Sequence, residues 1–326
     1  MKAVTIPRVG RPEVLTLVDV DVPRPAAGQV TIDVAYAGVN FADVMYRRGT
    51  VPLLLPLIPG IEVSGRIRAV GEGIDHLAVG QPVAALTIVG AGGYAEIVAV
   101  DARLVAPLPD DNEDLLPAAA GTPSNTTTAV LALTRVGRLA SDDVLLVHAA
   151  ASGLGSQIGQ VAATVKPQQI IGTVGHPDKI ATAHTFGYDT VLLRDDWLRD
   201  PTAQHRPNLV IDPVGGPVRQ ASLDALGADG RLIVIGNASG GAEMNVGAND
   251  LFFTSRTVAG FSLGALSAVR PDLAGDALRH AVQLVLDGHV RVDVNTTLPL
   301  EQAAEAHRRV ESGATTGKTV LAVGRR

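Results

Sequence analysis

The first 110 residues or so alternate short apolar runs with glycine and proline. The runs read QVTIDVAYAGV, VSGRIRAVG, GQPVAALT and YAEIVAV, and turn-forming residues lie between them. Short runs rich in β-branched residues at this spacing predict strands joined by tight connections. We therefore expect this part of the chain to form a partly open antiparallel β-barrel.

From about Leu133 the pattern changes to apolar strands that alternate with helical stretches. The strands read DVLLVHAA, QIIGTVG, TVLLR, NLVIDPVG and RLIVIG. Such alternation predicts a parallel sheet built by right-handed crossovers. Past Gly260 a helical stretch at 271–288 and a closing GKTVLAVG strand return to a mixed pattern. The pattern predicts an α/β protein, and a length of 326 residues suggests two domains.

Composition narrows the classes of function. The chain is 46% hydrophobic, has a formal net charge of −6 and shows no Lys- or Arg-rich tract, so nucleic acid is not an expected partner. It has no cysteine, which excludes a thiolate nucleophile and Cys-ligated zinc. The most apolar stretch, VPLLLPLIPG, is broken by prolines and is too short to cross a bilayer. The N-terminal MKAVTIPRVG has no apolar signal region, so we expect a cytoplasmic protein without a membrane segment.

The segment VLLVHAAASGLGSQIGQVA, at 144–162, has the form of a strand, a turn and a helix. In the G-x-G-x-x-G fingerprint, glycine stands where the backbone approaches a pyrophosphate. Here alanine and serine occupy 150–152, and glycine appears only at 153, 155 and 159. Taken alone, the segment is compatible with a variant dinucleotide site and equally with a strand–helix crossover that binds nothing.

Seven motifs in order make the chain recognisable: AGVNFADVMYRRG, PGIEVSGRIRAVG, GGYAEIVAV, LLVHAAASGLG, VIDPVGG, GRLIVIG and AHRRVESGATTGKTVLAV. Together they resemble the zinc-free quinone oxidoreductase branch of the medium-chain dehydrogenase/reductase superfamily. The resemblance implies a GroES-like catalytic domain at 1–124, completed by 263–326. It also implies a Rossmann domain, with a doubly wound parallel sheet, at 125–262. An alanine-rich phosphate turn is common in this branch, so the turn is expected to bind pyrophosphate.

The resemblance also implies where the cofactor binds. Ligands of such sheets lie at the carboxyl edge of the strands, and the turn adds backbone N–H groups at a helix N-terminus. The expected cofactor-binding residues are Asn40, Asn125, Thr128, Ala151, Ser152, Gly153, Leu154, Gly155, His176, Lys179, Arg194, Val214, Gly236, Asn237, Phe261 and Leu263.

The tip of the second Rossmann strand bears on the choice between NADH and NADPH. An NAD-selective site has an acidic residue there, whereas this chain reads TVGHPDK, with His176 at the tip and Lys179 just beyond. Arg194 follows the strand TVLL, and a guanidinium suits a phosphate. In similar quinone reductases a lysine and a tyrosine near these two places contact the adenosine phosphate. NADPH is the predicted cofactor; two ordinary surface charges are the alternative interpretation.

No metal is expected. Zinc-dependent relatives place a Cys and a His at the positions of Asn40 and Ile61, and the eight histidines here show no metal-ligand spacing. Carbonyl polarisation must then come from hydrogen bonds. The resemblance implies Asn40 and Tyr46 as the catalytic donors. Asp43 and Glu62 are expected to have supporting roles.

The function that the resemblance implies is NADPH-dependent hydride transfer to a quinone or an α,β-unsaturated carbonyl, in a homodimer whose edge includes GFSLG. A conjugated acceptor needs only neutral donors, because charge delocalises onto its oxygen, whereas alcohol oxidation needs a metal or a base. Two alternatives stay open: an enoyl-thioester reductase of lipid or polyketide assembly, and an NADPH-binding protein with little turnover. Phe41, where some enoyl-thioester reductases have tyrosine, argues against the first.

Overall fold

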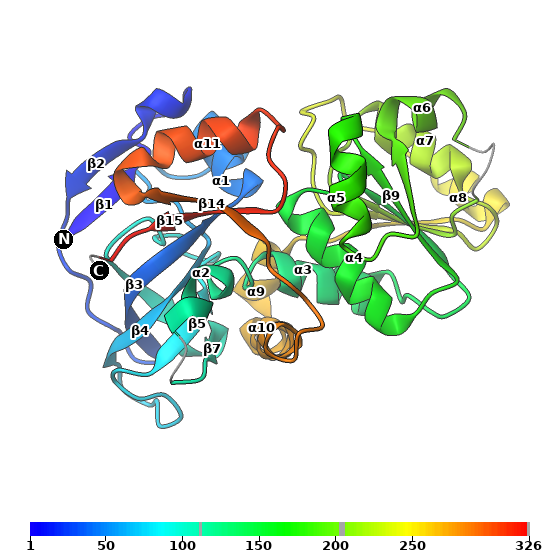
Figure 1. Cartoon of the computed structure of the whole chain (residues 1–326). Coiled ribbons are helices and arrows are strands. Elements are labelled where there is room, and N and C mark those ends of the chain that lie inside the picture. Colours follow the sequence, from blue (N-terminus) through cyan, green and yellow to red (C-terminus); the bar gives the residue numbers. More distant parts are fainter. Residues whose placement is uncertain (111–112, 202–205, 325–326) are drawn as a thin grey trace. The chain divides into compact units, whose positions relative to one another are not determined.

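The computed structural model describes residues 1–110, 113–201 and 206–324 (Figure 1). The chain forms two compact units. Unit 1 comprises Met1–Thr127 and Leu263–Arg326, and unit 2 comprises Thr128–Ser262. Among the described residues, no helix combines the length and the apolar character that crossing a bilayer requires.

A seven-stranded sheet is the framework of unit 1. Its strand order is β14-β15-β3-β4-β5-β7, with β6 paired to β3. All of its pairings are antiparallel except that of β14 with β15. The strands are β3 (Gln29–Val39), β4 (Glu62–Val70), β5 (Pro82–Leu86), β6 (Ile97–Asp101), β7 (Val105–Pro107), β14 (Val294–Pro299) and β15 (Lys318–Ala322).

The remaining elements of unit 1 surround this sheet. A separate antiparallel pair joins β1 (Lys2–Thr5) to β2 (Thr16–Asp19). In Figure 1, α11 lies beside α1, far from it in the sequence. The helices are α1 (Phe41–Arg48), α2 (Leu116–Ala119), α9 (Leu263–Val269), α10 (Pro271–Leu286) and α11 (Ala303–Glu311).

The pairing of β15 with β3 brings a C-terminal segment of the chain next to an N-terminal one. Its register places Thr319 opposite Val39. Lys318 therefore lies next to Asn40, the residue that follows β3. The antiparallel strands expected from the apolar runs are present, and the C-terminal strand completes their sheet.

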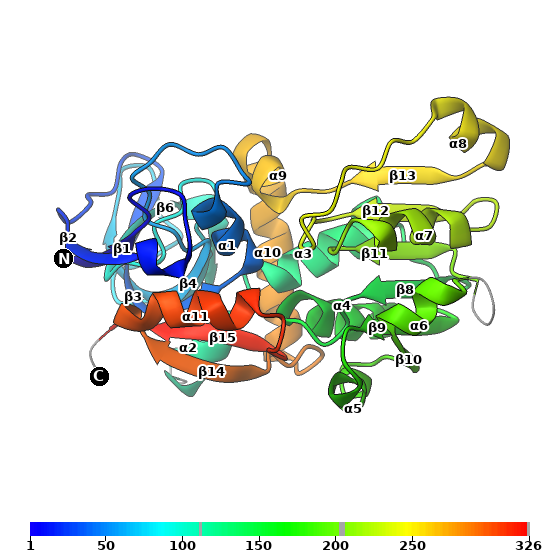
Figure 2. The same ribbon diagram turned by 90° about the horizontal axis from the view of Figure 1, so that it is seen from above.

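Unit 2 is built on a six-stranded sheet in which every pairing is parallel. The order β10-β9-β8-β11-β12-β13 is the doubly wound order in which the direction of winding reverses between the first and fourth strands. Figure 2 shows β13 at the outer edge of this sheet, with α8 beyond it. The strands are β8 (Val144–His148), β9 (Gln169–Val174), β10 (Thr190–Leu193), β11 (Leu209–Asp212), β12 (Arg231–Val234) and β13 (Thr257–Gly260).

The central strands of unit 2 are buried because helices connect them. Leu146, Ile171, Val210 and Leu232 come from four neighbouring strands and form one buried cluster with Trp197. The unit contains α4 (Gly153–Val165), α5 (Ile180–His184), α6 (Arg194–Arg199), α7 (Pro217–Ala225) and α8 (Ala248–Thr254). The connection from unit 1 runs through α3 (Asn125–Leu131) and a π-helical turn at Ala132–Val136.

Candidate active site and cofactor site

In unit 1 the candidate catalytic residues lie where β3 gives way to α1. Asn40 is the N-cap of α1 and has an extended backbone. Asp43, at the third helical position, accepts a hydrogen bond from Asn40 N at 3.0 Å and another from Gly60 N at 2.9 Å. Both carboxylate oxygens of Asp43 are thus engaged by backbone N–H groups. The buried carboxyl fixes the start of the helix against the segment before β4.

Burial changes the acidity of two groups on α1. It raises the pKa of Asp43 to about 7, although the N–H groups of Gly60 and Asn40 and the charge of Lys318 act in the opposite direction. Burial, with a smaller contribution from the charge of Asp43, raises the pKa of Tyr46 to about 12. The Tyr46 hydroxyl therefore keeps its proton at neutral pH and is available as a donor.

Asn40 belongs to a closed triangle of buried side chains. Lys318 Nζ donates to Asn40 Oδ1 at 2.7 Å, and Asn40 Nδ2 donates to Glu62 Oε1 at 2.8 Å. Lys318 Nζ also pairs with Glu62 Oε1. The other oxygen of Glu62 accepts from Ser124 N at 2.7 Å. A supporting role for Glu62 was expected from the sequence, whereas the contribution of Lys318 was not.

A second buried cluster anchors α1 to α11. Arg47 Nη2 contacts Glu311 Oε2 at 2.8 Å, and the Arg47 side chain is fully buried. Tyr94 OH lies 3.3 Å from His307 Nε2. Burial, together with the nearby charge of Arg47, lowers the pKa of His307 to about 3, so this imidazole is neutral. These contacts fix the helix that carries Tyr46.

In unit 2 the turn after β8 leads directly into α4. Ser152 is the N-cap of α4, and its hydroxyl accepts from Gly155 N at 3.0 Å. A Cβ on Gly155 would lie 2.2 Å from Ala149 O, so only glycine fits there. The N–H groups of Gly153 and Leu154, in the first helical turn, have no acceptor within the helix. The serine cap thus engages one of the N–H groups expected to face a pyrophosphate and leaves others.

The carboxyl edge of the sheet is organised by a buried ion pair. Asp212 accepts from Val214 N at 2.7 Å and from Gly215 N at 2.9 Å, and its other oxygen accepts from Arg219 Nε at 2.8 Å. Arg219 Nη2 also donates to Gly236 O. The pair therefore ties the loop after β11 to the loop after β12.

This arrangement brings three of the expected cofactor residues together. Ser239 N donates to Val214 O at 2.9 Å, and Ala238 N donates to Pro213 O at 3.1 Å. Val214 thus lies beside the loop that carries Gly236 and Asn237. Sequence reasoning identified these three residues but not the Asp212–Arg219 pair, whose only sign was the aspartate of VIDPVGG.

Of the three residues expected near an adenosine phosphate, the structure places Arg194 at the tip of β9, and His176 contacts Asp178 instead of the other two. The Arg194 guanidinium lies over the tip of β9, with Nη1 3.5 Å from the place where Gly175 would carry a Cβ. His176 is exposed and lies against Asp178, its Nδ1 3.3 Å from Oδ2. Lys179 is half-buried, and burial lowers its pKa.

His148, at the end of β8, is buried and hydrogen-bonded through both ring nitrogens. Ser222 donates its hydroxyl proton to Val218 O at 2.7 Å, so it accepts from His148 Nε2 at 2.8 Å. His148 Nδ1 then accepts from Thr173 Oγ1, also at 2.8 Å. Burial lowers the pKa of His148 to about 4, so the ring is neutral.

The other cofactor candidates lie where the chain passes between the units. Asn125 begins α3, and Thr128 follows one turn later. Phe261 N donates to Val234 O at 2.9 Å, and Leu263 begins α9. By unit, Asn40, Asn125 and Leu263 belong to unit 1, and the remaining candidates belong to unit 2.

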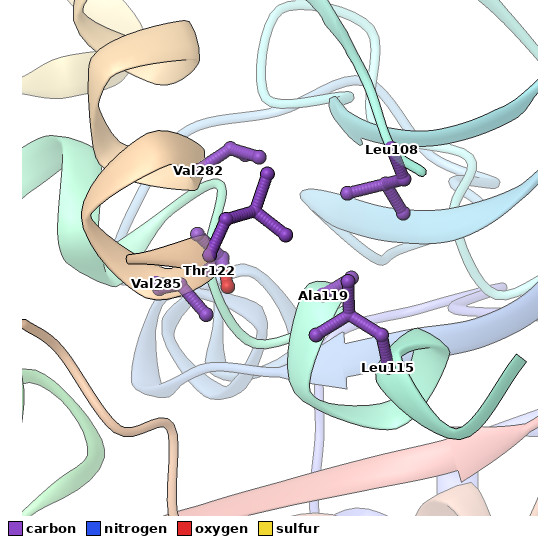
Figure 3. Close-up of a pocket in the computed structure, with 7 residues that line it drawn as sticks. Leu108, Leu115, Ala119, Thr122, Val282 and Val285 are labelled. Atoms are coloured by element: carbon purple, nitrogen blue, oxygen red, sulfur yellow. The ribbon is translucent and has the colours of Figure 1, made fainter. Parts of the chain in front are cut away.

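Two further features of the described residues bear on ligand binding. No three of their His, Asp or Glu side chains are grouped so that they could hold a metal ion. Unit 1 has an apolar depression between α2 and α10 (Figure 3). Its one polar lining side chain, Thr122, donates to Ala118 O at 2.9 Å. The depression has no other polar group that could orient a substrate, so it is not the candidate site.

Comparison with known proteins gives matches along nearly the whole chain. Residues 26–110 match the alcohol dehydrogenase GroES-like domain, and residues 183–321 match a family described as zinc-binding dehydrogenase. A probable quinone oxidoreductase of Schizosaccharomyces pombe is 30% identical over 98% of this chain and 96% of its own. The quinone oxidoreductase of Salmonella typhimurium is 31% identical over 96% of each chain.

Among solved structures, Escherichia coli quinone oxidoreductase complexed with NADPH superposes with a TM-score of 0.88. It is 29% identical in sequence and covers 99% of this chain and 100% of its own. The likeness confirms the expected fold, a GroES-like domain joined to a Rossmann domain with a parallel sheet.

The raised pKa of Asp43 predicts a pH dependence of stability. A carboxyl with a higher pKa in the folded state stabilises the fold fully below its unfolded pKa, near 4, and that contribution is lost as pH rises through about 7. The variant D43N has no such proton to lose. We therefore expect its free energy of unfolding, measured in urea, to rise relative to wild type between pH 5 and pH 8. A difference that is constant over this range would show that Asp43 titrates in its ordinary range.

Proposed function

The chain belongs to the quinone oxidoreductase branch of the medium-chain dehydrogenase/reductase superfamily, and we propose that it reduces a conjugated acceptor without a metal ion. The enzyme is an NADPH-dependent reductase. When bound, NADPH supplies a hydride from its nicotinamide ring. The proposed acceptor is a quinone or an α,β-unsaturated carbonyl, and the chain's own residues orient it and stabilise the charge that develops on its oxygen.

The observation that carries this proposal is the state of the groups around Asn40. Both oxygens of Asp43 accept backbone hydrogen bonds. Glu62 is engaged by Asn40, Lys318 and Ser124. Asp43 is thus held against the backbone and Glu62 within an ion pair, whereas Asn40 and Tyr46 are neutral donors. Neutral donors suffice for a quinone or enone, because its charge delocalises onto oxygen.

The same contacts support a reaction without zinc. Asn40 stands at a position where zinc-dependent relatives are expected to have a metal ligand, and the Lys318 ammonium already engages both Asn40 Oδ1 and Glu62 Oε1. A cation at this position would have to displace a buried ammonium. We propose that hydrogen bonds from Asn40 and Tyr46 replace the Lewis acid.

For the cofactor, the described residues of unit 2 offer a cradle that fits a dinucleotide. Gly155 permits the close turn, and Gly153 and Leu154 present N–H groups at the positive end of α4. We propose that residues 151–155 hold the pyrophosphate and that His176, Lys179 and Arg194 surround the adenosine phosphate. The rest of the cofactor would contact Asn40, Asn125, Thr128, Val214, Gly236, Asn237, Phe261 and Leu263.

We also propose a homodimer formed through the edge of unit 2. The edge strand β13 has one neighbouring strand, β12, and an unpaired edge is a template for pairing with another chain. Beside it, α8 exposes Phe252 and Phe253 to 75% and 78%, with their rings 5.1 Å apart. An exposed aromatic pair next to a free edge is typical of an interface.

The acceptor class can be tested by following NADPH oxidation with quinones, enones, enals and enoyl thioesters. We expect turnover of quinones or enones that survives a metal chelator. N40A should lower kcat by about 10²-fold, as loss of an oxyanion donor does, and Y46F should lower it less. The Kd for NADPH should be largely kept in Y46F.

Robust oxidation of a saturated primary alcohol, with no turnover of any quinone or enone, would contradict the proposal. A preference for enoyl thioesters would favour the alternative function, an enoyl-thioester reductase of lipid or polyketide assembly.

The NADPH assignment predicts a selective effect at two side chains. K179A and R194A should each lower kcat/KM with NADPH about tenfold, the value of one charge-assisted contact, and change kcat/KM with NADH little. R199A is the matched control, because Arg199 lies on the same helix as Arg194 and pairs with Asp196 on the surface. Equal losses with both cofactors, or none with NADPH, would remove these residues from the phosphate site.

The dimer proposal predicts that the double variant F252S/F253S shifts the protein to monomers in sedimentation velocity at micromolar concentration. L54S is the control, because Leu54 is 92% exposed and belongs to unit 1, whereas β13 and α8 belong to unit 2. A wild-type protein that sediments as a monomer, or a variant that remains dimeric, would rule out this edge as the interface.

A further inference from the structure

We propose that Lys318 is a positioning residue of the active site, which acts together with Glu62 to hold the Asn40 carboxamide in one orientation. The inference rests on the proposed function, because it assigns a role within the site that Asn40 and Tyr46 define. Lys318 stands 278 residues from Asn40 in the sequence. It reaches the site because β15 pairs with β3.

The charges around Asn40 select one of two orientations of its amide. A half-turn of the carboxamide would bring Nδ2 against the Lys318 ammonium and Oδ1 against the Glu62 carboxylate. Both contacts would then be repulsive, whereas the observed orientation makes both attractive. An amide nitrogen carries two N–H bonds, and Glu62 uses one. The triangle thus fixes the direction of the remaining N–H of Asn40.

The ammonium also affects the strength of this donor. Lys318 Nζ contacts the amide oxygen at 2.7 Å, and a positive charge there draws electron density away from the nitrogen. Chains of hydrogen bonds polarise one another in this way inside proteins. The free N–H is therefore a better donor to an oxygen on which negative charge develops than an isolated amide would be.

Two glycines leave room for the side chains of Glu62 and Lys318. A Cβ on Gly38 would lie 2.4 Å from Glu62 Oε1, and a Cβ on Gly121 would lie 2.8 Å from Lys318 Cγ. The two glycines come from β3 and from the segment after α2. Small residues at both places leave the Lys318 stem and the Glu62 carboxylate in contact with Asn40.

Stability alone does not account for the pair. Lys318 and Glu62 are 2% and 0% exposed, and removing such ions from water costs several kcal/mol each. Replacing a buried ion pair with apolar residues of similar volume is often neutral or stabilising. A role in orienting Asn40 explains why this site keeps two charges instead.

The experiment compares four variants. They are K318M, the charge-neutral variant E62Q/K318M, N40A, and the triple variant N40A/E62Q/K318M. K318M leaves an unpaired buried carboxylate and is expected to lose stability; E62Q/K318M keeps the volume without an unpaired charge. We expect E62Q/K318M to lower kcat at least about tenfold, less than the about 10²-fold loss on removal of an oxyanion donor because Asn40 itself remains. The Kd for NADPH should stay within about twofold of wild type. In the N40A background the same change should alter kcat less than about twofold, because the group that it positions is absent.

The matched control is the neutral variant R231M/D143N. It removes the buried pair of Arg231 and Asp143, which are 12% and 3% exposed in unit 2, and should change the melting temperature but not kcat. An unchanged kcat in E62Q/K318M would overturn the inference, as would an equal loss with and without Asn40. If the wild-type enzyme instead failed to oxidise NADPH with every quinone and enone tested, that result would contradict the proposed function.

Discussion

Buried charge beside the N-terminus of α1 is the constraint on which the rest of unit 1 depends. Asp43, Glu62 and Lys318 are all removed from water, and each is tolerated because a specific group from another part of the chain faces it. Gly60 and Asn40 supply N–H groups to Asp43, and Ser124 supplies one to Glu62. A buried ion left without its partner costs about 3–5 kcal/mol. The positions of β3, β4, β15 and α1 are therefore set by one another.

Unit 2 uses the same principle at the carboxyl edge of its sheet. Asp212 and Arg219 form a buried pair that holds two loops, and His148 is buried as a neutral ring between two hydroxyl groups. In both units, buried polar groups that pair with one another hold the backbone next to the candidate site. Rigid support matters because a donor must meet the position of the developing oxyanion without rearrangement.

The chemistry that the site favours follows from which groups remain free. The carboxylates near Asn40 are occupied, the neighbouring imidazole of unit 1 is neutral, and the Tyr46 hydroxyl retains its proton. Such a site offers hydrogen-bond donors, and its titrating carboxyl, Asp43, is bound by two backbone N–H groups. It is better matched to an acceptor that needs charge stabilisation than to an alcohol that must be deprotonated.

The sequence by itself determined the fold, because strand and helix periodicities are local and because the motifs follow one another in the order that the resembling family has. It also pointed to Asn40, Tyr46 and the turn at 151–155, since each stands directly before, within or after a recognisable element. The engagement of Gly155 N by the Ser152 hydroxyl and the placement of His176 against Asp178 depended on side-chain geometry. Only the tertiary structure decided that Lys318 would meet Asn40 and that Arg219 would join two loops. These contacts arise from strand register and from the need to pair each buried charge, and neither leaves a periodic signal in the sequence.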